Sequence, residues 1–320
     1  MRILIIGVKG FLGRYLSELA IATGWQVHGL DISDSPAATD CKLASIRLGD
    51  YSTLKTLSQA PELATFDAMV QLAAPGRSTD FESALAQGTA DFHRFLDHLC
   101  QLGFEGHLLF VSSSAVYGDG ERVGRESFTE TSPLHPETAY GRSKAVCEEL
   151  LAAHFRRAPQ GFTIVRPFNL IGPRQSPMFF ASNLMRQLVA IKKGSKAPVL
   201  ELGNTAAFRD FIDVRDVAAA ILSLLALAGQ GEVYNVASGQ AQDLGQLIQR
   251  AQDMLGLRVQ LKAAQARPGD VVFQLGSSVK LERKTGWRPR VTFDQSLRDM
   301  MNYWLANIEG QHESSDPGRR

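Results

Sequence analysis

The sequence predicts an α/β protein built on a doubly wound parallel sheet, with a smaller mixed α/β portion toward the C-terminus. Two observations lead to this fold class. Short β-branched segments alternate with amphipathic helical patterns, and a glycine-rich loop directly follows the first of these segments. Such alternation is typical of parallel strands with helices on both faces of the sheet. The expected strands are Ile3–Ile6, Gln26–Leu30, Ala68–Leu72, His107–Ser112 and Thr163–Arg166.

The alternation changes after Pro167, where loop residues become frequent. We expect a helix from Phe179 to Lys193, a strand at Glu232–Val236 and a helix near Leu244–Leu255. The sequence therefore predicts a first domain from 1–168 and 206–237, and a smaller second domain from 169–205 and 238–308. Residues 309–320 have no apolar periodicity and are expected to form a disordered tail.

Composition narrows the classes of partner. The chain has 320 residues and a formal net charge of +1, which gives no overall attraction to nucleic acid or to an anionic membrane. No apolar run approaches the roughly 20 residues of a membrane-spanning helix. The three cysteines, Cys41, Cys100 and Cys147, follow neither a disulfide nor a zinc pattern. We therefore expect a cytoplasmic protein with reduced thiols and without a metal site.

A glycine triplet lies between the first expected strand and the first helix. Gly7 allows a tight turn, Gly10 lets a pyrophosphate approach the backbone, and Gly13 lets helix and strand pack closely. The free N–H groups at the start of the helix then face the phosphates. In this position the triplet predicts a dinucleotide-binding site of the Rossmann type.

Carboxylates after the second strand indicate which dinucleotide binds. Asp31 would accept hydrogen bonds from the adenosine ribose hydroxyls and would repel a 2′-phosphate. No Arg or Lys follows until Lys42, so NAD(H) is favoured over NADP(H), although Lys9 lies within the glycine loop. Asp50 is placed to meet the adenine edge, and a surface turn is the alternative for it.

A proton-handling pair stands at helical spacing. Tyr140 and Lys144 are four residues apart, so they share one face of a helix, where a nearby ammonium favours the phenolate and lowers the pKa of the tyrosine. The strand before them ends in three serines, 112–114, at the edge of the sheet where open α/β sheets bind ligands. A hydroxyl there can polarise a substrate oxygen beside Tyr140. These residues predict hydride transfer between a nicotinamide and a carbonyl–alcohol pair.

Taken in order, these motifs resemble the extended short-chain dehydrogenase/reductase family, which contains nucleotide-sugar epimerases, dehydratases and reductases. The resemblance runs from about residue 1 to 305. It includes Leu72-Ala-Ala74, Arg166-Pro-Phe-Asn-Leu-Ile-Gly-Pro173, Arg209-Asp-Phe-Ile-Asp-Val-Arg-Asp216, Tyr234-Asn-Val-Ala-Ser-Gly239 and Arg267-Pro-Gly-Asp270. It implies a nicotinamide cofactor, a nucleotide-diphosphate sugar as substrate of the second domain, and a homodimer.

The resemblance also implies roles for individual residues. Ser113 would join Tyr140 and Lys144 as the catalytic hydroxyl. Arg209 and Arg267 would hold the substrate diphosphate, because a guanidinium fork matches phosphate oxygens. Other substrate contacts would come from Ser114, Asn169 and Asn183. Further cofactor contacts would come from Phe11, Leu12, Ile32, Tyr51, Leu72, Ala73, Ala74 and Pro167.

Two departures from the family pattern bear on the reaction. The 4,6-dehydratases place an acidic pair after the catalytic hydroxyl, where this chain has Ser114 and Ala115, so water elimination lacks an acid and a dehydratase is rejected. Sugar-acid decarboxylases carry a glutamate at the position of Ala115. Many relatives have an asparagine where this chain has Leu85, three residues before Gly88.

Within the family, the motifs are most similar to those of GDP-4-keto-6-deoxymannose reductases and allied 4-ketohexose reductases. The expected reaction is reduction of a nucleotide-linked 4-keto-6-deoxy sugar, with hydride added at C4 and a proton supplied by Tyr140. A nucleotide-sugar 4-epimerase is the nearest alternative, because it uses the same catalytic residues and retains its NAD. A non-catalytic dinucleotide-binding protein is the alternative from another class, and it predicts loss of the Tyr, Lys and Ser set.

Overall fold

The main sheet of the protein has seven strands, all parallel. The computed structural model describes residues 1–33, 42–58, 63–73, 81–155, 161–227, 231–263 and 271–308, apart from the side chains of 81–85 and 263. The strand order is β10-β6-β5-β4-β1-β2-β3, so the order reverses beside β1. These strands are β1 (Arg2–Ile6), β2 (Gln26–Asp31), β3 (Ser45–Leu48), β4 (Ala68–Gln71), β5 (His107–Val111), β6 (Phe162–Pro167) and β10 (Glu232–Val236). The predicted fold class is confirmed.

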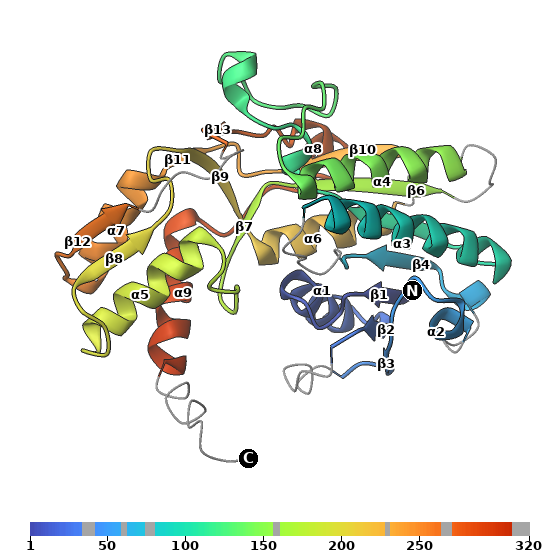
Figure 1. The fold of residues 1–320 in the computed structure, drawn as a ribbon. Coiled ribbons are helices and arrows are strands. Elements are labelled where there is room, and N and C mark those ends of the chain that lie inside the picture. Colours follow the sequence, from blue (N-terminus) through green and yellow to red (C-terminus); the bar gives the residue numbers. More distant parts are fainter. Residues whose placement is uncertain are drawn as a thin grey trace.

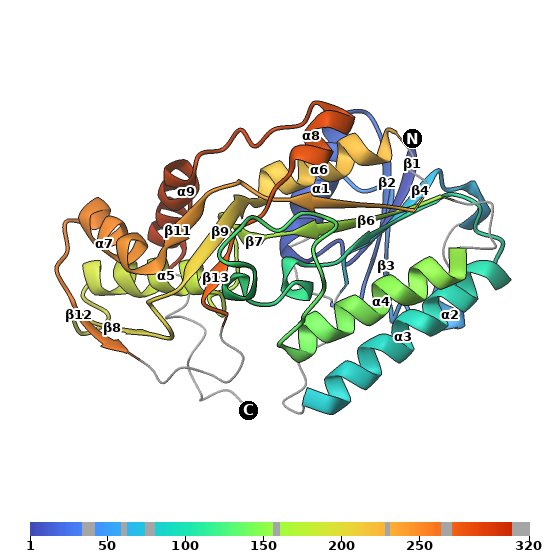
Figure 2. The ribbon, with the colours of Figure 1, turned by 90° about the horizontal axis from the view of Figure 1, so that it is seen from above.

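Helices cover both faces of this sheet, as Figure 2 shows. One face carries α1 (Phe11–Ala22) and α6 (Val214–Leu225), and the other carries α3 (Phe81–Gln101) and α4 (Ala139–Phe155). Alternate side chains of β1 enter two different cores: Ile3 and Ile5 lie in the core that contains residues of α1 and α6, while Leu4 and Ile6 lie in the core of α3 and α4. Burial on both faces explains why this strand is apolar throughout.

The second portion lies beside the sheet, on the left of Figure 1. A four-stranded sheet contains β7 (Asn169–Ile171), β9 (Phe208–Asp213), β11 (Ala241–Asp243) and β13 (Phe273–Gln274). A separate pair joins β8 (Val199–Leu202) and β12 (Gln260–Ala263). The helices here are α5 (Phe180–Lys192), α7 (Leu244–Leu255) and α9 (Phe293–Asn307), which share a third core. This portion is mixed α/β, as the sequence predicted.

Short elements complete the described chain. They are α2 (Leu54–Ser58), η2 (Leu63–Thr65), η3 (Ser114–Val116), η4 (Gly120–Val123) and α8 (Val279–Thr285). In the parts of the chain that the structure describes, no helix is long and apolar enough to span a membrane. The expected tail, 309–320, lies outside these parts.

The segment 206–237 does not return as a whole to the main sheet. We expected it to do so, and β10 indeed pairs with β6. The other strand of this segment, β9, pairs instead with β7, β11 and β13. Strand periodicity does not report which distant strand will be the partner, so the sequence could not distinguish the two. The domain boundaries themselves stay a proposal.

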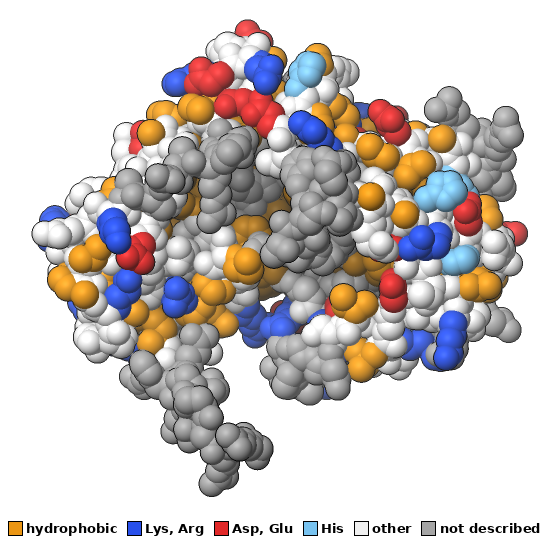
Figure 3. All heavy atoms as spheres, viewed as in Figure 1, with side chains coloured by type: hydrophobic (Ala, Val, Ile, Leu, Met, Phe, Trp, Pro, Cys, Tyr) orange, Lys and Arg blue, Asp and Glu red, His pale blue; other side chains and the backbone are white. Residues whose placement is uncertain are grey.

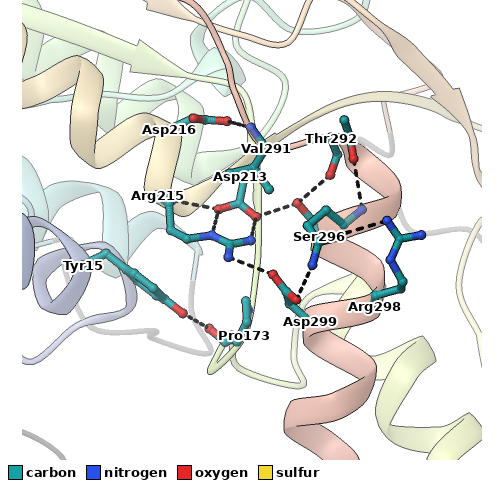
Figure 4. A network of polar contacts seen from close by, with 11 residues as sticks. Tyr15, Pro173, Asp213, Arg215, Asp216, Val291, Thr292, Ser296, Arg298 and Asp299 are labelled. Atoms are coloured by element: carbon teal, nitrogen blue, oxygen red, sulfur yellow. Dashed lines mark hydrogen bonds and ion pairs between the residues drawn. The ribbon is translucent and has the colours of Figure 1, made fainter.

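A buried polar network connects the two portions (Figure 4). Asp213 caps α6 and accepts hydrogen bonds from the Arg215 guanidinium, at 2.8 Å for both Nε and Nη2, and from the Ser296 hydroxyl on α9. Arg215 also pairs with Asp299 of α9 at 2.8 Å. Because Asp213 stands where β9 meets α6, its carboxylate holds the small sheet, α6 and α9 together.

Candidate active site

The glycine loop follows β1 at the edge where the parallel strands end. Gly7 has a φ of +86°, and a Cβ there would lie 3.0 Å from the backbone nitrogen of Ala73. A Cβ on Gly13 would lie 2.2 Å from the carbonyl oxygen of Gly7, so only glycine lets α1 approach the loop this closely. Gly10 is the N-cap of α1, and no side chain caps this helix start. The loop therefore fits a pyrophosphate, whose oxygens would accept hydrogen bonds from the backbone N–H groups at the start of α1.

Of the two predicted acidic residues, Asp31 contacts this loop and Asp50 forms a local turn. The Asp31 carboxylate at the end of β2 accepts hydrogen bonds from the N–H groups of Lys9, at 2.8 Å, and Ser33, at 3.0 Å. This arrangement joins the glycine loop to the end of β2, where the adenosine ribose was predicted to bind. The Asp50 carboxylate accepts the N–H of Ser52 at 2.8 Å and so forms a local turn.

The other predicted cofactor residues differ in exposure. Ile32 is 72% exposed, whereas Leu12 and Tyr51 are buried in the cores on opposite faces of the sheet. Phe11 begins α1 and meets the Tyr15 ring edge-on. Leu72 and Ala73 follow β4, and Pro167 ends β6. The remaining one, Ala74, lies outside the described residues.

Ser113, Tyr140 and Lys144 come together at the ends of β5 and α4. The Ser113 side chain lies beside Tyr140 and favours the ionised form of its hydroxyl. Lys144 Nζ is buried, donates to the carbonyl oxygen of Val111 at 2.8 Å, and lies 5.9 Å from the centre of the Tyr140 ring. The predicted catalytic set is therefore one constellation on two adjacent elements.

Burial is the main influence on the pKa values of Tyr140 and Lys144. The residue Tyr140 is 45% exposed, and desolvation of its hydroxyl raises the pKa, whereas the neighbouring Ser113 side chain works in the opposite direction. Desolvation lowers the pKa of Lys144 to about 8, against the opposing influence of Cys147 and Glu148. We expected Lys144 to lower the pKa of Tyr140. The structure differs because the ammonium is directed at the Val111 carbonyl.

Gly141 contributes to the site without having been singled out in the sequence. It follows Tyr140 in the first turn of α4, and a Cβ there would lie 2.5 Å from the carbonyl oxygen of Ala115 in η3. The helix that carries Tyr140 thus rests directly on the backbone of the serine loop. The Tyr-Gly dipeptide carried no signal for this contact, because it depends on a residue 26 positions earlier.

The predicted substrate residues surround Gln274 of β13. Its side-chain amide donates to the carbonyl oxygen of Ser114 at 3.4 Å, and its Oε1 accepts from Asn169 Nδ2 at 3.2 Å. Arg209 on β9 is in register with Gln274 and donates to the carbonyl oxygens of Phe208 and Val271. Gln274 was missed because no motif pointed to it.

Two predicted substrate residues stand apart from this group. Asn183 lies on α5, where its side chain is half-buried. Arg267 lies outside the described residues. The described residues contain no group of three or more His, Cys, Asp or Glu that could hold a metal ion.

Surface charge is mixed on the face shown in Figure 3. Lys and Arg side chains lie interspersed with Asp and Glu over the described part of this face. An anionic ligand must therefore be bound by individual cations at its own site, and Arg209 on β9 is a candidate for this role.

Together the fold, the glycine loop and the Ser–Tyr–Lys constellation define an NAD(P)-dependent oxidoreductase of the Rossmann type. Residues 3–237 match the model of the NAD dependent epimerase/dehydratase family. The chain belongs to this family, and the resemblance seen in its motifs is confirmed.

Relatives match nearly the whole chain. A GDP-6-deoxy-D-mannose reductase of Pseudomonas aeruginosa is 31% identical over 319 residues, covering 96% of this chain and 98% of that protein. A UDP-glucose 4-epimerase of Pisum sativum is 25% identical over 346 residues, covering 96% of each chain.

Solved structures agree with the sequence relatives. The structure of RMD from Pseudomonas aeruginosa complexed with NADPH has a TM-score of 0.81 and 30% identity, covering 96% of this chain and 99% of that chain. The Thermus thermophilus UDP-glucose 4-epimerase in complex with NAD has a TM-score of 0.80 and 26% identity, covering 95% of this chain and 99% of that chain.

Proposed function

We propose that this protein reduces a nucleotide-linked 4-keto-6-deoxyhexose, with hydride added at C4 and a proton supplied by Tyr140. The observation that carries the proposal is the placement of Ser113 beside Tyr140, with Lys144 on the same helix, at the ligand-binding edge of the sheet. The 31% identity to a GDP-6-deoxy-D-mannose reductase over nearly the full length supports the substrate class.

Ser113, Tyr140 and Lys144 have different roles in the proposed carbonyl reduction. Hydride comes from the reduced nicotinamide when this cofactor is bound. Ser113 orients the sugar carbonyl beside the Tyr140 hydroxyl, which donates its proton to the carbonyl oxygen as the new C–H bond forms. Tyr140 is left as a phenolate and regains a proton from solvent. Lys144, whose ammonium is held by the Val111 carbonyl oxygen, would hydrogen-bond the ribose of the nicotinamide.

The sugar nucleotide would lie against the second portion. Arg209 and Arg267 are proposed to hold its diphosphate, and Ser114, Asn169 and Asn183 to contact the rest of the ligand. The charge of a diphosphate explains why a nearly neutral protein would place arginines at this position.

A 4-epimerase is the second candidate, and the UDP-glucose 4-epimerase relatives favour it. Such an enzyme needs the same three catalytic side chains. The two candidates are separated by the fate of the cofactor, because an epimerase oxidises and reduces the same sugar and consumes no NAD(P)H.

The first experiment is a panel of 4-keto and 4-hydroxy nucleotide sugars, incubated with NADH, with NADPH and without added cofactor, with products identified by NMR. Oxidation of the reduced cofactor with a 4-keto sugar supports the reductase. Interconversion of two sugars without added cofactor supports the epimerase, and inactivity in every condition rejects both.

Tyr140→Phe tests the proton donor. Removal of the hydroxyl should lower kcat by a factor of about 10²–10⁴. The Kd for the cofactor should change little, because the glycine loop is unaltered. Unchanged turnover would remove Tyr140 from the reaction.

NAD(H) is the proposed preference. The Asp31 carboxylate is tied to the glycine loop through the Lys9 N–H, where a 2′-phosphate would meet its negative charge. Lys9 and Arg14, which donates to the carbonyl oxygen of Lys9 at 3.1 Å, are cations of the loop and of α1, and Arg47 of β3 is in register with Leu30, next to Asp31.

Asp31→Asn should therefore shift the ratio of kcat/KM values for NADPH and NADH about tenfold toward NADPH. Lys9→Met is the matched variant, because it removes a positive charge where Asp31→Asn removes a negative one. A wild-type enzyme that prefers NADPH, and loses this preference in Lys9→Met, would contradict the assignment.

A homodimer in the cytoplasm completes the proposal. Residues 145–155 of α4 are the expected contact, and Val146 on this helix is 40% exposed. Light scattering during gel filtration measures the oligomeric state.

A further inference from the structure

A buried guanidinium connects the two elements that carry the catalytic set. Arg166 of β6 pairs with Glu148 of α4, with Nε 3.0 Å from Oε1 and 3.2 Å from Oε2. Its Nη1 donates to the hydroxyl of Tyr117 at 2.9 Å. Both charged side chains are only 6% exposed.

Each partner of Arg166 leads directly to a catalytic residue. Glu148 follows Lys144 by four residues and Tyr140 by eight, so the three side chains lie along one face of α4. Tyr117 is the C-cap of η3, and Ser113 is the N-cap of the same short helix. The Tyr117 N–H donates to Ser114 O at 3.0 Å, and Ser113 Oγ accepts from Ala115 N–H at 3.1 Å, so η3 joins Ser113 to Tyr117 through local hydrogen bonds.

The far side of Tyr117 is also held. Its hydroxyl donates to Asn235 Oδ1 of β10 at 2.7 Å, and Asn235 in turn donates to the carbonyl oxygen of Phe128 at 3.1 Å. The Tyr117 ring stacks on the Phe128 ring at 4.8 Å with an interplanar angle of 8°. The Tyr117 hydroxyl, the one polar atom of this side chain, therefore has a hydrogen-bond donor and an acceptor within the protein.

We propose that Arg166, Glu148 and Tyr117 are positioning residues that set the distance between Ser113 and Tyr140. None of them donates a proton to the substrate in the proposed reaction. They act because one planar guanidinium reaches both Glu148 of α4 and Tyr117 of η3, and Gly141 lets the first turn of α4 lie directly against η3. The inference rests on the proposed function for its kinetic test only.

Two variants loosen this link with little change in volume. Tyr117→Phe keeps the stacked ring and removes the shared hydroxyl. Arg166→Lys keeps the charge beside Glu148 and removes the fork. Thr163→Val is the matched control: it lies on the same strand as Arg166, and its hydroxyl is hydrogen-bonded to buried His107 at 3.0 Å, at the opposite end of the strand.

The first measurement is amide hydrogen exchange on the protein without substrate. Residues 112–118 and 139–143 should exchange about tenfold faster in Tyr117→Phe and Arg166→Lys than in Thr163→Val. The second measurement is steady-state kinetics. In both positioning variants kcat should fall about tenfold or more, because small misplacements of reacting groups are costly. KM and the cofactor Kd should stay within about twofold.

If Arg166 and Tyr117 only stabilise the fold, Tm should fall in their variants as it does in Thr163→Val. The kcat values and the local exchange rates should then equal those of Thr163→Val. That pattern in Tyr117→Phe, the variant that preserves the core packing, overturns the inference. If the wild-type chain turns over no nucleotide sugar, the proposed function fails, and the exchange measurement still decides whether this link exists.

Discussion

Lys144 shows how strongly a single residue depends on its place in the fold. The residue is 3% exposed, and its ammonium donates to the Val111 carbonyl oxygen at the end of β5. Desolvation lowers its pKa to about 8. A lysine in this state can change charge close to neutral pH, as groups in functional sites often do.

This burial has a consequence for stability. Between pH 8 and the ordinary lysine value of 10.5, the unfolded chain holds a proton that the folded chain has released, so the free energy of unfolding rises with pH across this window. Below about pH 8 the full cost of the buried charge is present.

Lys144→Met should therefore stabilise the fold at pH 7 by on the order of 1–2 kcal/mol, after allowance for the lost hydrogen bond, and should abolish activity. The gain should shrink toward pH 10.5 in denaturant titrations. Lys262→Met, at a 74% exposed side chain, is the control and should change stability by no more than about 0.5 kcal/mol. A variant less stable than wild type at pH 7 would contradict the cost assigned to the charge.

At the scale of elements, the site depends on how α4 meets η3. The helix supplies Tyr140 and Lys144, and the short 3-10 helix follows Ser113. Gly141 is the contact between them, since its position relative to the Ala115 carbonyl leaves no room for a methyl group. The candidate active site is thus a packing interface between two elements as well as a set of side chains.

Gly141→Ala should displace α4 from the serine loop. We expect kcat to fall about 10- to 100-fold and the free energy of unfolding to fall by about 1–3 kcal/mol, because the backbone must shift to admit the methyl group. Gly203→Ala is the control, because a Cβ there meets nothing within 4 Å. Equal activity of the two variants would show that the contact does not position Tyr140.

At the scale of the whole molecule, the two portions are joined around Asp213. This carboxylate has no exposed side-chain surface and bonds to Arg215 and Ser296, while Asp216 accepts the N–H groups of Arg290 and Val291 near 3.0 Å and 2.9 Å. The Tyr15 hydroxyl of α1 donates to the carbonyl oxygen of Pro173 at 3.0 Å. The motif that contains Asp213 and Asp216 therefore holds the fold together, although it helped to indicate the family.

Asp213→Asn should destabilise the protein by about 2–4 kcal/mol, because it leaves Arg215 without its buried partner. Thermal unfolding should start at a lower temperature, while kcat at 25 °C stays within about threefold of wild type. The control is Asp253→Asn, where the carboxylate is 51% exposed and pairs with Arg258 on the surface. A loss no larger than in this control would show that the network contributes little.

Much of the site could be predicted from local pattern. The five expected strands were found because apolar runs between turn residues identify buried parallel strands, and they end within a residue or two of the expected positions. The edge strand β3 was not predicted, because most of its residues are exposed. Tyr140 and Lys144 were found because four-residue spacing places side chains on one helix face. Gln274 and Tyr117 could not receive their roles in this way, since each acts through partners more than 40 residues away.

Periodicity and motif order therefore predict the class of fold, the position of the dinucleotide loop and the types of the candidate catalytic residues. Each of these features depends on a short stretch of consecutive residues. Tertiary structure alone decides that β9 joins the small sheet, that Lys144 is directed at Val111, and that Arg166 joins the helix of Tyr140 to the loop of Ser113. These depend on burial and on the partners of polar groups, and both are set only when distant segments of the chain pack together.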